Sequence, residues 1–136
     1  MKRFLLLAVL LASCGPSYII PESETRMTVE SNYDAVFSSV ISYCAINSIP
    51  ITFSDKSSGV ISTGWSSNPF AQNMIEKAAP IRYNFTIRKN ESVSIIYAVL
   101  TGRNMNGGSF PYSGEYSIKT YRGMFAQIDS LRKHNL

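Results

Sequence analysis

Few residues in this chain could carry catalysis or bind a metal. Among 136 residues there are one histidine, His134, and two cysteines, Cys14 and Cys44. A structural zinc site takes four nitrogen or sulfur ligands, so this set cannot build one within a single chain. His134 stands close to the C-terminus, where a positive charge suits the dipole at the end of an expected helix. We therefore expect no metal and no cofactor.

The carboxylates and nucleophiles show no catalytic pattern either. The nine acidic residues are scattered, and Asp55 and Glu91 lie in expected turns. No spacing nominates a carboxylate pair, no serine stands in a G-x-S-x-G motif, and the glycine pair at 107–108 lacks the lysine of a phosphate-binding loop. Cys44 and His134 could act as nucleophile and base, but Cys44 belongs to an apolar helical stripe. We therefore expect that this protein is not an enzyme.

Two arginines could form a binding surface. Arg82 and Arg88 share the polar face of an expected strand, with Asn84 and Thr86 between them. Such a basic strip could face lipid A phosphates, peptidoglycan or an acidic partner. It could also be a solvated sheet face that charge protects from aggregation.

Aromatic residues in a glycine-rich segment form a second candidate. The segment 102–116 reads GRNMNGGSFPYSGEY and is expected to be a long loop. Phe110 and Tyr112 could contact a partner there, since aromatic residues are enriched at protein interfaces. They could equally fold back on the core as anchors, and Trp65 has the same two interpretations.

The N-terminus carries the most specific signal. Lys2 and Arg3 precede the apolar run 4–12. This run is shorter than the roughly 20 residues of a membrane span and has the layout of a secretory signal. Its end, Leu11-Ala12-Ser13-Cys14, resembles the lipobox of bacterial lipoproteins. The resemblance implies that residues 1–13 are removed, that the Cys14 sulfur is diacylated and that the acyl chains hold the protein on a bilayer. The alternative is an ordinary secretory signal with an incidental Cys14.

The resemblance also implies a compartment. Gly15 follows the cysteine, and the absence of an aspartate at this position favours the outer membrane. The protein would then be lipid-anchored there and would face the periplasm. Removal of residues 1–13 leaves eleven basic and nine acidic residues, a net charge of +2. That charge and that compartment argue against a nucleic-acid partner.

The remaining chain is expected to hold a lipidated tether over 14–25 and a single domain over 26–136. A strand at 26–30 precedes a helix at 31–48, capped by Ser31 or Asn32. Four strands follow at 49–53, 60–65, 81–88 and 93–101, with a short helix at 70–79 between the two pairs and a turn at 89–92. The strand 93–101 is apolar on both faces, which predicts a central position with cover on both sides. The final helix lies within 117–135. The apolar residues of the first helix form one stripe, made of Val36, Phe37, Val40, Ile41 and Cys44.

These elements predict an α+β fold with a single antiparallel sheet of about four to five strands and two main helices. The element order and the segment ITFSDKSSGVI resemble, over residues 26–134, the helix-grip domains of outer-membrane lipoproteins such as BamC. The resemblance implies a sheet that curls around a long C-terminal helix. It also implies a non-catalytic protein-interaction or accessory module of an envelope assembly or secretion complex. The alternative is a binder of a non-protein envelope ligand, such as peptidoglycan or lipid, that uses Arg82 and Arg88.

Overall fold

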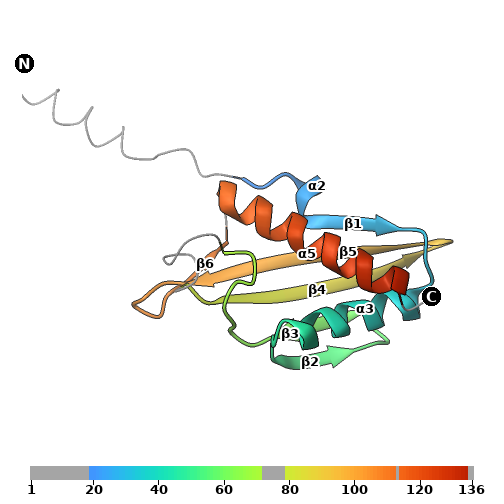
Figure 1. Cartoon of the computed structure of the whole chain (residues 1–136), viewed down its shortest axis with the longest axis horizontal. Helices are drawn as coiled ribbons and strands as arrows, with labels where there is room; N and C mark the ends of the chain where they lie inside the picture. The colour runs from blue at the N-terminus through green and yellow to red at the C-terminus, as the bar shows by residue number, and fades with distance from the viewer. Residues whose placement is uncertain (1–18, 72–78, 113, 135–136) are drawn as a thin grey trace, which may run out of the picture.

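The computed structural model describes residues 19–71, 79–112 and 114–134 (Figure 1). The expected signal peptide, Cys14 and most of the helix expected at 70–79 therefore lie outside the described residues. In chain order the elements are α2 (Glu22–Thr25), β1 (Arg26–Val29), α3 (Tyr33–Ile46), β2 (Ile51–Asp55), β3 (Val60–Thr63), β4 (Ile81–Asn90), β5 (Val93–Arg103), β6 (Ser109–Pro111) and α5 (Glu115–His134).

The strands form one antiparallel sheet. Its order is β1-β5-β4-β3-β2, and β6 also pairs with β5, beyond the end of β1. The expected α+β class with a single antiparallel sheet and two long helices is confirmed, as is the central position of β5. β4 and β5 form the longest pairing, from Ile81 opposite Gly102 to Asn90 opposite Val93.

Both long helices pack on the same face of the sheet, side by side and antiparallel (Figure 1). α3 begins as expected, because the Asn32 side chain accepts a hydrogen bond of 2.7 Å from the Ala35 N–H. The core lies between this helical layer and the sheet. It is built from alternate residues of β4, chiefly Tyr83, Phe85 and Ile87, and from the apolar stripes of α3 and α5, chiefly Val36, Val40, Tyr43, Cys44, Tyr121, Met124 and Ile128.

The expectation that β5 is covered on both sides is wrong for the described residues. Ile96, Ala98 and Leu100 are buried beneath the helices. Val99 points the other way and is 60% exposed, because no described helix lies on that face. The apolar residues on both faces of β5 therefore predict its central position in the sheet correctly, but they wrongly predict that both of its faces are covered.

Residues 102–111 form the tip of a β-hairpin and residues 115 and 116 begin α5, so the expectation of a long loop over 102–116 is wrong. β5 continues to Arg103, and β6 returns along it with Phe110 opposite Gly102. A Cβ at Gly102 would lie 2.5 Å from the Phe110 ring, so this glycine makes room for an aromatic neighbour. Similarly, β4 extends to Asn90, so the expected turn at 89–92 shortens to Glu91 and Ser92.

The end of the expected tether is part of the fold. Residues 22–25 form α2, and the Glu24 carboxylate accepts a hydrogen bond of 2.9 Å from Nε of Arg122 in α5. A second tie joins α5 to the sheet, because the Leu100 N–H donates to Tyr121 Oη at 3.0 Å in the gap between β1 and β6. These contacts bring the start of the described chain against the helical layer.

Gly59 in the turn between β2 and β3 gives a test of this packing. Its φ is +74°, and a Cβ there would lie 2.1 Å from the Ile87 carbonyl oxygen. Gly107 has a similar φ of +83°, but a Cβ there would meet nothing closer than Arg103 at 3.6 Å. We expect Gly107→Ala to lower the free energy of unfolding by about 1 kcal/mol, the cost of the left-handed conformation, and Gly59→Ala by about 3 kcal/mol or more. Urea denaturation of both variants checks this, and equal losses would contradict the close approach at Gly59.

Candidate functional site

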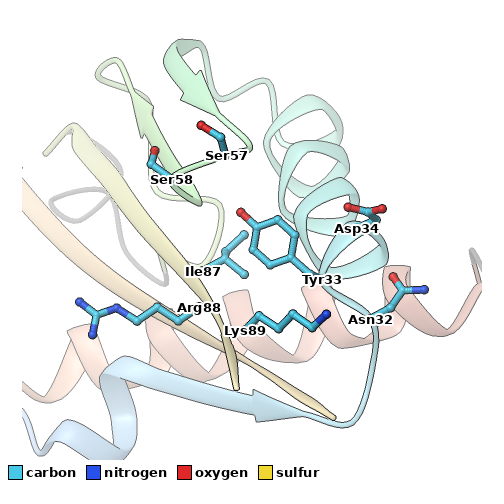
Figure 2. Close-up of a pocket in the computed structure, with 8 residues that line it drawn as sticks. All are labelled: Asn32, Tyr33, Asp34, Ser57, Ser58, Ile87, Arg88 and Lys89. Atoms are coloured by element: carbon cyan, nitrogen blue, oxygen red, sulfur yellow. The ribbon is translucent and has the colours of Figure 1, made fainter. Parts of the chain in front are cut away.

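A polar hollow of about 600 Å³ opens at one end of the sheet, between the start of α3, the β2–β3 turn and the end of β4 (Figure 2). The Tyr33 hydroxyl donates to the Lys56 carbonyl at 2.5 Å, and burial together with Asp55 raises the pKa of Tyr33. Lys56 Nζ pairs with Asp34 at 2.9 Å. Eight residues line the hollow: Asn32, Tyr33, Asp34, Ser57, Ser58, Ile87, Arg88 and Lys89.

The polar groups of this hollow serve the fold around it. The Asn32 side chain caps α3, and Tyr33 and Asp34 hold the β2–β3 turn through Lys56. The same turn is fixed from inside by Asp55. Hydrogen bonds from Ser58 and Ser57 lower the pKa of Asp55 to about 2. The hollow contains no nucleophile paired with a base among its lining residues, so it is a weak candidate for catalysis.

The face of the sheet opposite the helices is the better candidate, and we call it the open face. The register places Arg82 beside Thr101 and Arg88 beside Ile95, so both arginines lie on it as expected from their alternation. Its apolar part includes Val99 and Phe53, which are 60% and 54% exposed. On β4 and β5 the face consists of Arg82, Asn84, Thr86, Arg88, Asn90, Val93, Ile95, Tyr97, Val99, Thr101 and Arg103.

Aromatic rings hold the arginines of the open face. The guanidinium carbon of Arg82 lies 5.1 Å from the Trp65 ring centroid, and that of Arg103 lies 5.6 Å from the same centroid. Arg88 lies 5.5 Å from the Tyr97 centroid. Contacts at this range are cation–π interactions, which fix the charged groups without neutralising them.

None of these three arginines forms an ion pair with any described residue. Arg82 Nε is also buried without a hydrogen-bond acceptor in the described structure. Asp55 is the acidic residue that β2 contributes to this face, and it is bound to its own turn. The open face therefore carries three arginines whose charges no ion pair in the described structure neutralises.

Trp65 and Arg103 were not part of the basic strip expected from sequence. β3 ends at Thr63, two residues before Trp65. Ser66, which follows Trp65, forms a β-bridge with Ile81 at the start of β4, and the two backbones exchange hydrogen bonds of 2.9 and 2.8 Å. This bridge sets Trp65 beside Arg82. The β4–β5 register brings Arg103 to the same tryptophan ring. In the sequence, only the length of the β4–β5 hairpin indicates this position of Arg103.

Phe110 and Tyr112, the two aromatic residues expected to contact a partner, lie apart from the arginines of the open face. Phe110 is 38% exposed and faces Gly102 on the helix-covered side of the sheet. Tyr112 is half-buried, and its Oη accepts a hydrogen bond of 3.0 Å from Asn68 Nδ2, which also donates to Thr120 Oγ1 at 3.0 Å. Tyr112 thus anchors the hairpin to the core, and the structure does not join it to Arg82 and Arg88 in one surface.

Cys44 is fully buried within α3, and burial raises the pKa of its thiol to about 12. The thiolate, which is the reactive form, is therefore scarce at neutral pH. His134 Nδ1 donates a hydrogen bond of 2.7 Å to the Ser130 carbonyl oxygen on its own helix. Among the described residues, no group of three or more His, Cys, Asp or Glu could hold a metal ion. No helix within them is both long and apolar enough to span a membrane.

Comparison with known proteins supports the fold. The crystal structure of a DUF4468 family protein from Bacteroides ovatus is similar, with a TM-score of 0.55 and 10% sequence identity, over 85% of this chain and 90% of that chain. At this identity the similarity shows a shared α+β fold alone. No protein-family model and no curated protein sequence matches the chain. The resemblances to lipoproteins and to BamC-like helix-grip domains stay predictions.

Proposed function

We propose that this protein is a lipoprotein of the bacterial envelope that acts without catalysis, as an interaction or accessory module of an assembly or secretion complex. The sequence Leu11-Ala12-Ser13-Cys14 supports the anchor, which would place the domain at the outer membrane on its periplasmic side. The observation that carries the binding role is the open face, since both long helices cover the other side of the sheet. A domain that has no catalytic pattern but carries a lipid anchor is explained if it holds a partner protein near the membrane.

The chemistry of the open face indicates an acidic protein partner. Val99 and Phe53 offer exposed apolar area of the kind found at protein interfaces. Arg88, stacked on Tyr97, is exposed and has no ion pair in the described structure. An acidic partner surface would supply the missing negative charge and fix the orientation of the complex. Because the arginine is already stacked on its ring, binding would cost little side-chain entropy.

The anchor is tested on the native protein. We expect mass spectrometry of the N-terminal peptide to show a chain that begins at Cys14 with a diacylglyceryl group on its sulfur, and Cys14→Ala to block this processing. A mature N-terminus elsewhere, or an unmodified Cys14, would remove the lipoprotein proposal.

The binding surface is tested by photo-crosslinking in the cells that make the protein. Val99 on the open face and Ile46 at the end of α3 are 60% and 59% exposed, so a photoreactive residue at either position is equally accessible. We expect position 99 to form one discrete adduct with an envelope protein, and position 46 to form none.

A charge variant sharpens this comparison. Because the proposed partner is acidic, Val99→Glu should abolish co-purification of that protein, and Ile46→Glu should leave it unchanged. Adducts at both positions, or at neither, would contradict a partner on the open face.

A further inference from the structure

Trp65, Arg82 and Arg103 form a compact unit on the open face, which we call the tryptophan–arginine cluster. Two guanidinium groups share one indole ring, at 5.1 and 5.6 Å from its centroid. Two like charges brought to one ring repel each other unless an anion lies between or beside them. The buried Nε of Arg82, which has no acceptor in the described structure, also lacks the partner that a buried donor requires. The cluster therefore has the composition of an anion site.

The chemistry of the cluster suits a phosphate group. Arginine presents a planar fork of donors that matches phosphate oxygens, and its charge persists at every physiological pH. Tryptophan is enriched at membrane–water interfaces, where its ring sits at the level of the headgroups. A phosphate on a lipid headgroup would thus meet both residue types of the cluster in their usual setting.

The cluster lies at the end of the sheet where the described chain begins. Ile19 lines a groove of about 300 Å³ at the edge of β5, with Val99 of the open face and with Leu100 and Tyr121 of the helix-covered side. Thr101, about 7 Å further along the same face of β5, stands opposite Arg82. Figure 1 shows the start of the described chain at the same end of the sheet as β6.

The proposed anchor brings this end close to lipid. Four residues separate Cys14 from Ile19, and the five steps of the chain between these two residues span at most about 17 Å when fully extended. The hairpin between β5 and β6 projects from the same end, with Met105 fully exposed near its tip. This step rests on the proposed function, because the distance limit holds only if Cys14 is acylated.

We propose that the tryptophan–arginine cluster binds the phosphates of anionic lipid headgroups and so orients the domain on the membrane that carries its anchor. Trp65 then sits at the headgroup level and Met105 meets the outer acyl region. Arg88 lies about 20 Å from Arg82 along β4, at the other end of the face, and remains directed away from the bilayer towards a partner.

The single tryptophan of the chain is a reporter placed within the site. The test uses the chain from residue 14 onward with Cys14→Ser, which contains every described element of the fold and no acyl group. We expect Trp65 fluorescence to shift to shorter wavelength with vesicles of phosphatidylcholine and phosphatidylglycerol, and brominated lipid to quench it. Vesicles of phosphatidylcholine alone should have little effect, and high salt should reverse the shift.

Three single variants separate the site from general charge attraction. Arg82→Gln and Arg103→Gln should each weaken vesicle binding about fivefold, the loss expected for one basic residue at an anionic surface. Arg88→Gln removes the same charge from the same strand and face, but its distance exceeds the screening length, so it should weaken binding less than about twofold. Urea denaturation of each variant confirms that it is folded.

Several outcomes would overturn the proposal. An unchanged Trp65 spectrum with anionic vesicles would do so, and so would equal losses in all three variants. If millimolar inorganic phosphate reproduced the shift while vesicles did not, the cluster would be a free-phosphate site. If polyglutamate bound more tightly than vesicles, the cluster would belong to the acidic partner surface. Because the tested chain carries no acyl group, these results do not depend on whether Cys14 is lipidated.

Discussion

Packing of α3 and α5 on a single face of the sheet is the interaction on which the rest of the structure depends. Tyr43 of α3 meets the rings of Tyr83 and Phe85 edge-on, and Tyr121 of α5 bonds the β5 backbone in the gap between β1 and β6. Burying one face in this way removes its apolar area from water, and this is the main favourable contribution to the fold. The consequence for function is geometric. Since both long helices are used on one side, the arginines and apolar residues of the opposite side are displayed on a rigid support.

The local elements could be predicted from the sequence because short-range signals determine them. Asn32 caps α3, alternation defines β4, and the apolar stripe of α5 follows helical spacing. The segment 102–116 was mispredicted because its glycines have a packing role. Gly102 accommodates the Phe110 ring, a contact between two strands that no local pattern encodes. β5 was misjudged for a related reason, since apolar residues on both faces do not say which face the helices cover.

The candidate site was predicted only in part. Arg82 and Arg88 share a face because they are six residues apart, and residues separated by an even number along a strand point to the same side. Their neighbours depend on register and on a bridge. The pairing of Ser66 with Ile81 places Trp65, and the length of the β4–β5 hairpin places Arg103. Phe110 and Tyr112 contact the fold itself on the side that the helices cover. The similar Bacteroides ovatus structure shares this fold, and a shared fold does not by itself indicate a function.

We propose that the open face is occupied when the protein is in the cell envelope. Hydroxyl-radical footprinting of the protein in isolated envelopes and of the purified domain measures this directly. We expect protection of Trp65, Tyr97 and Met105 in the envelope, while Tyr116, which is 53% exposed on α5, reacts equally in both samples. Protection of Tyr116 in place of Trp65 and Tyr97, or the same reactivity at all four residues in both samples, would contradict it.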